Sequence, residues 1–279
     1  MRYHPLAIVL ACGAGTASAQ STYEVPGDLP NLTTALNPSV TPVEAGDTIR
    51  LTDPLADLPG DFDPFHTGNF TVSIADLTIE SVAGETVVID GGNAGTVITV
   101  TEEGSGLTLR NVIIENGVAP GDGGGVHALA ADLMVEDCVF RNNTAQDDGG
   151  AILSDQGALT IRRTRFENNH ALGTGGSGDA DGGAIFKFEG NLTIEGSDAG
   201  DPDTANSVFI NNSSDDVGGA VSADFVNDLN KRAQLIRWVR GDDGGLSVQL
   251  GYNAVDTSPD HLGLTVDFWL GEMAHELSS

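Results

Sequence analysis

Basic residues are scarce in this chain of 279 residues, which has 12 Lys and Arg against 41 Asp and Glu and a formal net charge of −29. Such an acidic chain repels phosphate groups, whereas binding to nucleic acids or to anionic membranes needs contiguous basic patches. The composition therefore excludes nucleic acid as a partner. Cysteine is also scarce, since the chain has only Cys12 and Cys138. If Cys12 is lost with the leader segment described next, no intramolecular disulfide is possible.

The chain also lacks any hydrophobic run of the roughly 20 residues that a membrane-spanning helix requires. A short apolar stretch at residues 5–11 follows Arg2, and the small residues of Ala17–Ala19 come just after it. This order is typical of a cleaved export signal. We predict a signal peptide at residues 1–19 and, because Arg2 is its one charged residue, a mature chain with a net charge of −30 and no transmembrane helix. A lipoprotein signal ending at Cys12 is the alternative.

The 37 glycines argue against an all-helical fold, because glycine destabilises helix interiors. They belong to a repeat of 26 residues. Each copy has a leucine that starts a short alternating apolar segment, an apolar residue seven positions later and a glycine pair sixteen positions after the leucine. The leucines are Leu107, Leu133 and Leu159, the apolar residues are Ile114, Phe140 and Phe166, and the glycine pairs start at Gly123, Gly149 and Gly175. The register resumes after a seven-residue insertion at 175–181 and a ten-residue insertion beyond Ile194.

A repeat of this kind predicts an all-β fold, a right-handed parallel β-helix with three short strands in each coil. Equivalent side chains would stack about 4.8 Å apart, so that the leucines and Ile114, Phe140, Phe166 and Phe209 form internal ladders. Asn143, Asn169 and Asn212 recur at one turn, where asparagine can bond to turn amides. A β-sandwich with coincidental spacing is the alternative.

The repeat also suggests how the chain is divided. Residues 71–225 are predicted to be the β-helix, and the proline-rich residues 20–70 an N-terminal cap that covers its first coil. Residues 226–279 differ in composition and contain two alternating segments, at 246–252 and 264–270, that predict strands. We interpret this last part as a C-terminal cap or a divergent segment, with a partial barrel as the alternative.

Two recurring motifs carry a resemblance to a known family. Gly-Gly-Ala-Ile occurs at 149–152 and 182–185, with Gly-Gly-Ala-Val at 218–221, and Phe-x-x-Asn occurs at 140–143, 166–169 and 209–212. Together they resemble the repeats of the polymorphic outer membrane protein family, and residues 25–49 look like the start of secreted β-helices of the pectate-lyase-like superfamily. The resemblance implies display at a bacterial cell surface, with outer-membrane association and adhesion. In that family a C-terminal membrane barrel follows the repeats, and residues 226–279 are too few to form one.

The sequence contains no recognisable catalytic constellation. β-Helix lyases and hydrolases need clustered carboxylates or a calcium site beside a basic residue. Arg162, Arg163 and Arg165 lie in one unit, and neither Arg141 nor Lys187 shares a column with them. We therefore expect a structural or adhesive module without catalytic activity, whose ligand is an extracellular polysaccharide or protein. A polysaccharide-binding or polysaccharide-degrading β-helix is the alternative, and an exposed row of aromatic residues, suggested only by Phe186 and Phe188, would favour it.

Asp122, Asp148 and Asp181 each stand directly before a glycine pair. Stacked coils would bring these acids to about 5 Å from one another, where like charges repel unless a cation lies between them. Calcium prefers six to eight oxygen ligands, so the three aspartates form a candidate calcium site. The alternative is an acidic face in open solvent that keeps the protein soluble.

Overall fold

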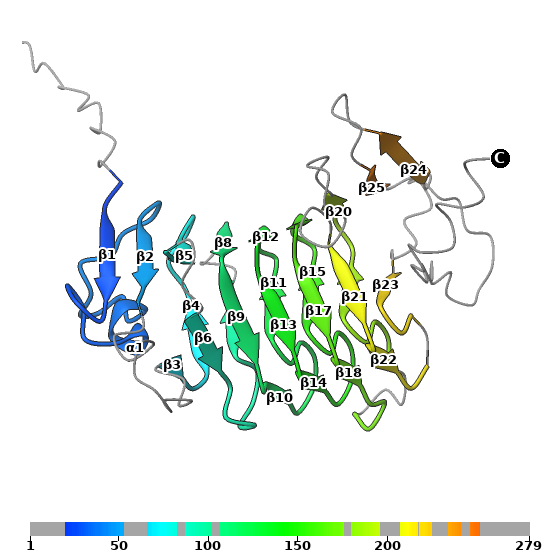
Figure 1. Cartoon of the computed structure of the whole chain (residues 1–279), viewed down its shortest axis with the longest axis horizontal. Coiled ribbons are helices and arrows are strands. Elements are labelled where there is room, and N and C mark those ends of the chain that lie inside the picture. Colours follow the sequence, from blue (N-terminus) through cyan, green and yellow to red (C-terminus); the bar gives the residue numbers. More distant parts are fainter. Residues whose placement is uncertain are drawn as a thin grey trace, which may run out of the picture.

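The computed structural model describes residues 20–52, 66–82, 87–101, 106–175, 180–195, 207–216, 218–224, 234–240 and 246–251. In these ranges almost all regular structure is β, and α1 (Leu32–Ala35) is a single short turn of helix. Strands pair with the equivalent strand one coil away, in parallel and in register, so that the chain forms a parallel β-solenoid (Figure 1). The predicted fold class is confirmed. The predicted signal peptide lies outside the described residues.

Four parallel sheets run along the solenoid. Sheet A contains, in spatial order, β1 (Thr22–Val25), β2 (Thr48–Leu51), β5 (Thr78–Ser81), β8 (Leu107–Arg110), β12 (Leu133–Glu136), β16 (Leu159–Arg162) and β20 (Leu192–Glu195). Sheet B contains β3 (His66–Thr67), β6 (Val87–Asp90), β9 (Val112–Glu115), β13 (Val139–Arg141), β17 (Arg165–Glu167) and β21 (Val208–Ile210). Sheet C contains β4 (Phe70–Val72), β7 (Ile98–Val100), β11 (Val126–Leu129), β15 (Ile152–Asp155), β19 (Ile185–Phe188) and β23 (Val221–Asp224). Sheet D contains β10 (Val118–Ala119), β14 (Thr144–Ala145), β18 (His170–Ala171) and β22 (Ser213–Ser214).

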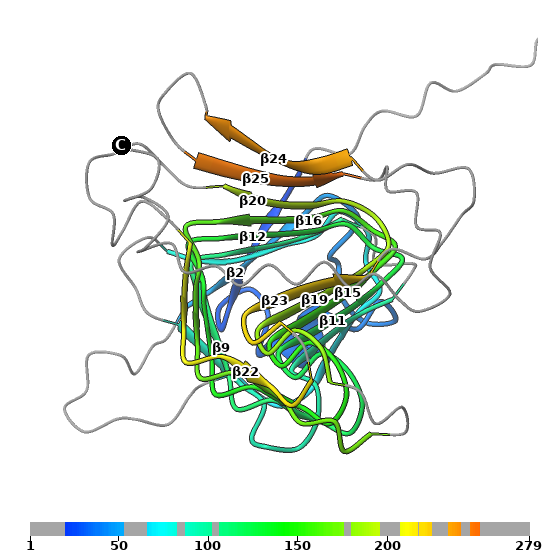
Figure 2. The same cartoon turned by 90° about the vertical axis from the view of Figure 1, so that its right-hand side faces the viewer.

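Each regular coil therefore has four strands, one from each sheet, where the sequence predicted three (Figure 2). The additional strands belong to sheet D and are only two residues long. Two residues are too few to produce an alternating pattern, which explains why they were not predicted.

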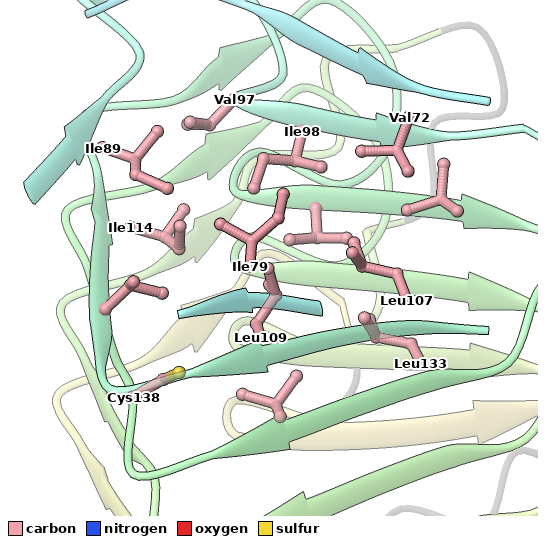
Figure 3. Packing of buried hydrophobic residues seen from close by; sticks show 14 of the residues in the cluster. Val72, Ile79, Ile89, Val97, Ile98, Leu107, Leu109, Ile114, Leu133 and Cys138 are labelled. Carbon is pink, nitrogen blue, oxygen red and sulfur yellow. The ribbon is translucent and has the colours of Figure 1, made fainter. Parts of the chain in front are cut away.

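The interior is built from ladders of equivalent apolar side chains (Figure 3). Leu107, Leu133, Leu159 and Leu192 pair in register along sheet A and are all buried. In sheet B the rings of Phe140 and Phe166 stack with centroids 5.2 Å apart, and those of Phe166 and Phe209 with centroids 4.9 Å apart. The predicted ladders are confirmed, and they bury continuous apolar surface along the stack.

Buried asparagines connect successive coils at the turn between sheets B and D. Asn143 Nδ2 donates to the carbonyl oxygen of Ile114 at 3.0 Å, and the backbone N–H of Asn143 donates to Asn169 Oδ1 at 3.1 Å. The backbone N–H of Asn169 donates in the same way to Asn212 Oδ1. Stacked side-chain amides thus satisfy buried backbone groups that the turn leaves unpaired, as predicted.

Both ends of the described chain depart from the regular coil. β1 and β2 extend sheet A at the N-terminal end, and α1 begins beside them, where Asn31 Oδ1 accepts the backbone N–H of Thr34 at 2.8 Å. At the other end β25 (Leu246–Gly251) pairs antiparallel with β20, and β24 (Gln234–Arg240) pairs antiparallel with β25. β25 falls on the alternating segment predicted at 246–252. The segment at 264–270 lies outside the described residues.

Candidate functional site

The Asp-Gly-Gly corners, which start at Asp122, Asp148 and Asp181, connect sheet D to sheet C in three successive coils. At residues 148–150, Gly149 has φ +67°, a left-handed conformation that suits glycine. Gly150 is required for a different reason, because a Cβ at this position would collide with the carbonyl oxygen of Gly183 in the next coil. The two glycines bring adjacent corners into contact and hold the preceding aspartates in a column.

Two aspartates of the column, Asp122 and Asp148, accept hydrogen bonds from the backbone. Asp122 Oδ1 accepts the N–H of Asp148 at 3.1 Å, and Asp148 Oδ1 accepts the N–H of Asp181 at 2.8 Å. Each carboxylate therefore binds the backbone of the equivalent aspartate one coil further along. This gives the acids a role in coil stacking that the sequence analysis did not predict.

Asp122, Asp147 and Asp148 are half-buried, and each offers a carboxylate oxygen that lies within 4.8 Å of the other two. Among the described residues they are the one group of three acidic, histidine or cysteine side chains arranged in this way. Asp147 was not among the predicted ligands, although its position beside Asp148 was a signal for it. Asp181 is not part of this group, and its contact with Asp148 is through the backbone.

The environment of Asp148 disfavours its charge. Burial raises the pKa of Asp148 to about 7, and repulsion from Asp122, Asp181 and Asp147 adds to the effect, while the hydrogen bond from the Asp181 backbone opposes it. A carboxylate with a raised pKa gains more from a bound cation than one already stabilised by a positive neighbour. The oxygen donors fit a hard cation such as calcium, with the remaining ligands supplied by other oxygens.

Five arginines in the described part of the solenoid are in ion pairs. On the outer face of sheet A, Arg50 contacts Glu80 at 3.0 Å, and Arg110 contacts Glu80 at 3.3 Å and Glu136 at 2.9 Å. Arg163 also pairs with Glu136, at 2.6 Å. On sheet B and its margin the pairs are Arg141 with Glu115 and Arg165 with Glu167. None of these pairs brings a basic residue to the Asp-Gly-Gly corners.

The register extends the ion pairs into an alternating column. Along the outer face of sheet A the paired positions are Glu24, Arg50, Glu80, Arg110, Glu136 and Arg162. A second column on the same face holds Thr22, Thr48, Thr78, Thr108, Met134, Thr160 and Thr193. We name this surface the threonine–charge face. It is polar, and neither column contains an aromatic residue.

The two phenylalanines of β19 do not continue into a row. Phe186 pairs in register with Leu153 and Ser222, and Phe188 pairs with Asp155. Phe186 is also buried, with 6% of its surface exposed. In the described sheet C, therefore, β19 has no aromatic neighbour in either column.

Comparison with known proteins identifies the repeat. Residues 137–155 and 206–224 match the family model of the Chlamydia polymorphic membrane protein repeat. The first match contains Phe140 and the corner at Gly149, and the second contains Phe209 and the corner at Gly218. No curated protein and no solved structure gives a significant match to the chain. No helix among the described residues is long and apolar enough to cross a membrane.

Proposed function

Because the chain carries two polymorphic membrane protein repeats on a parallel β-solenoid, we propose that it is exported and displayed at the cell surface as a structural or adhesive module without catalytic activity. The observation that carries the proposal is the repeat itself, since its Phe-x-x-Asn and Gly-Gly motifs form the internal ladder and the corners of the solenoid. The name of the repeat family supports a location at the surface or in the outer membrane.

The threonine–charge face supports an adhesive role. It presents hydroxyl groups and alternating charges on a sheet whose strands are held in register by the buried ladders. Such a face offers many weak polar contacts that repeat at about 4.8 Å, which suits binding to another extended surface.

The state of the basic residues supports a role without catalysis. Arg110, Arg141, Arg163 and Arg165 are engaged by carboxylates, and Lys187 is fully buried. A lyase-type base must be free to act on the substrate, whereas these arginines are engaged by carboxylates and Lys187 is inaccessible. The absence of an aromatic row in the described sheet C also disfavours the polysaccharide-degrading alternative, because sugar rings commonly stack on aromatic side chains.

Two experiments test the proposal. Fractionation of cells that produce the chain should recover it from the cell envelope or the medium, and recovery only from the cytoplasm would refute export. Purified protein incubated with a panel of acidic and neutral polysaccharides should release no reducing ends and no unsaturated products. Turnover of any polysaccharide would replace the non-catalytic function with the alternative.

A further inference from the structure

The outward charges of sheet A are balanced, unlike those of the chain as a whole. Sheet A forms one side of the solenoid (Figure 2), and from β1 to β16 the charged column of its threonine–charge face alternates between glutamate and arginine. The column contains Glu24, Arg50, Glu80, Arg110, Glu136 and Arg162. In the whole chain, 12 basic residues stand against 41 acidic ones. A face of average composition would therefore repel a second copy, whereas this column carries no net charge.

The guanidinium groups of this column are held in place and still have donors to offer. Arg110 Nε donates to Glu136 Oε2 at 2.9 Å, and Arg110 Nη1 donates to Glu80 Oε2 at 3.3 Å, so these two contacts use two of its five N–H groups. The side chains of Arg50 and Arg110 are 36% and 43% exposed. Ordered side chains lose less conformational entropy on binding, which favours contact with carboxylates supplied by a partner.

The order of the charges indicates which partner supplies those carboxylates. A two-fold axis that runs parallel to the strands places the column of one copy opposite the column of another, with the order of the coils reversed. Because the column alternates and has six members, every glutamate then faces an arginine. The three facing pairs are Glu24 with Arg162, Arg50 with Glu136, and Glu80 with Arg110. The threonine column also faces itself, with Thr78 opposite Thr108, and its short side chains let the two sheets approach.

We propose that the threonine–charge face binds the same face of a second copy of this chain, in the antiparallel arrangement given by this two-fold axis. The proposal names the partner of the adhesive module described above and rests on that function. Because the net charge of −29 repels copies in other orientations, the balanced face also selects the orientation. The outer face of sheet B lacks this property, since its neighbouring Asp90 and Glu115 carry like charges.

The face is small, so the contact between two single copies is weak. Six strands of four residues cover about 29 Å by about 13 Å. This is roughly 400 Å² for each copy, or about half of what a standard protein interface buries on each side. Exposed ion pairs also contribute little individually. The contact therefore needs many copies acting together, as display on a cell surface would provide.

Clustering of beads coated with the purified chain tests the proposal, because each bead presents many copies. At about 0.15 M salt, wild-type beads should cluster. Beads carrying Arg110→Glu alone, or Glu80→Arg alone, should remain single, because like charges then face each other at the centre of the contact. A mixture of the two kinds of bead, dyed in different colours, should form mixed clusters. In the mixture, position 80 of each variant faces the opposite charge at position 110 of the other.

Two further variants separate the face from general effects of charge. Arg141→Glu reverses the same charge on sheet B, where Arg141 pairs with Glu115, and it should cluster like the wild type. Thr108→Tyr keeps every charge and adds bulk beside the two-fold axis, so it should abolish clustering. Thermal melting followed by circular dichroism checks that each variant is folded.

The proposal is overturned if wild-type beads remain single, if Thr108→Tyr beads cluster, or if Arg141→Glu prevents clustering as Arg110→Glu does. A mixture of folded Arg110→Glu and Glu80→Arg that stays single would overturn it as well. Wild-type beads that bind only to beads coated with alginate or dextran would assign the face to a polysaccharide. All these results concern purified protein, so a failure here is distinct from a failure of export or display, which cell fractionation measures.

Discussion

Asp148 is placed where two requirements conflict. Its Oδ1 atom must accept the backbone N–H of Asp181, yet the carboxylates of Asp122 and Asp147 lie close to it. The same conflict would be absent with asparagine, which keeps the acceptor and removes the charge. The presence of aspartate rather than asparagine at this position favours a bound cation.

The raised pKa of Asp148 predicts a specific dependence of stability on pH. Its folded pKa of about 7 exceeds the unfolded value of 3.8, so its contribution to stability is fully present below pH 3.8 and is lost as the pH rises through 7. Asp148→Asn does not titrate. We expect it to be more stable than the wild type at pH 8 by about 1–2 kcal/mol after allowance for solvent screening, and this advantage should vanish near pH 4. Urea unfolding of both proteins across this pH range is the measurement, and an advantage that does not change with pH would contradict the assignment.

If the corner is a cation site, calcium should offset the destabilisation that the charged Asp148 causes at high pH. We expect calcium to raise the melting temperature beyond the rise given by sodium chloride of the same ionic strength, because binding stabilises only the folded state. The increment should be larger at pH 8 than at pH 5.5, since a protonated Asp148 is a poor ligand. It should also shrink in Asp148→Asn. A solvated acidic face, the other interpretation, predicts no difference between the two salts.

The asparagine ladder predicts that truncating one of its side chains lowers the stability of the protein strongly. Asn169→Ala removes the acceptor of the Asn143 N–H and the donor to the Phe140 carbonyl, both of which are buried. Leaving these groups unpaired should lower the free energy of unfolding by about 2–4 kcal/mol. Asn191→Ala is the matched control at an exposed turn position, and it should cost less than about 0.5 kcal/mol. Equal losses in chemical denaturation would show that the ladder is not a special source of stability.

The strands of sheet A are aligned by charge as well as by apolar burial. Arg110 lies between Glu80 and Glu136 and contacts both, so a slip by one coil would place like charges opposite one another. Exposed pairs of this kind contribute little individually, but a column of them disfavours the wrong register.

Reversing one charge in this column should therefore destabilise the protein more than removing the charge. Arg110→Glu places three carboxylates in a row and should lower the free energy of unfolding by about 1 kcal/mol, whereas Arg110→Gln should cost about half as much. High salt should restore much of the loss in Arg110→Glu, because it screens repulsion between exposed groups. If the two variants are equally stable at low salt, the alternation of charges does not contribute to the stability of the protein.

The internal ladders were predictable because the spacing of 26 residues places identical side chains one above the other. Phe140, Phe166 and Phe209 are examples. The strands of sheet D were not predictable, because a strand of two residues, such as Val118–Ala119, is too short to show periodicity. The hydrogen-bonding role of Asp148 depends on a contact between coils at the glycine corner, which spacing alone does not describe. The burial of Lys187 was signalled by its alternation with Ile185, but only the small neighbours in its column make the space for it.

At the scale of the whole molecule, one short repeat explains both the architecture and the match to the polymorphic membrane protein repeat. Each coil leaves its apolar edge uncovered until the next coil stacks on it, so the coils stabilise one another in sequence. The formal net charge of −29 favours repulsion between copies of the chain. These properties suit a rigid module presented outside the cell.

Cysteine labelling of intact cells tests that claim most directly. Cys138 is buried, and burial raises its pKa to about 12, so the native thiol should not react with a maleimide that cannot cross membranes. Val40 and Leu129 are exposed, which makes Val40→Cys and Leu129→Cys suitable reporters. We predict that both variants are labelled on intact cells and that the unchanged chain is not. Labelling of the two variants only after the cells are lysed would contradict display at the surface.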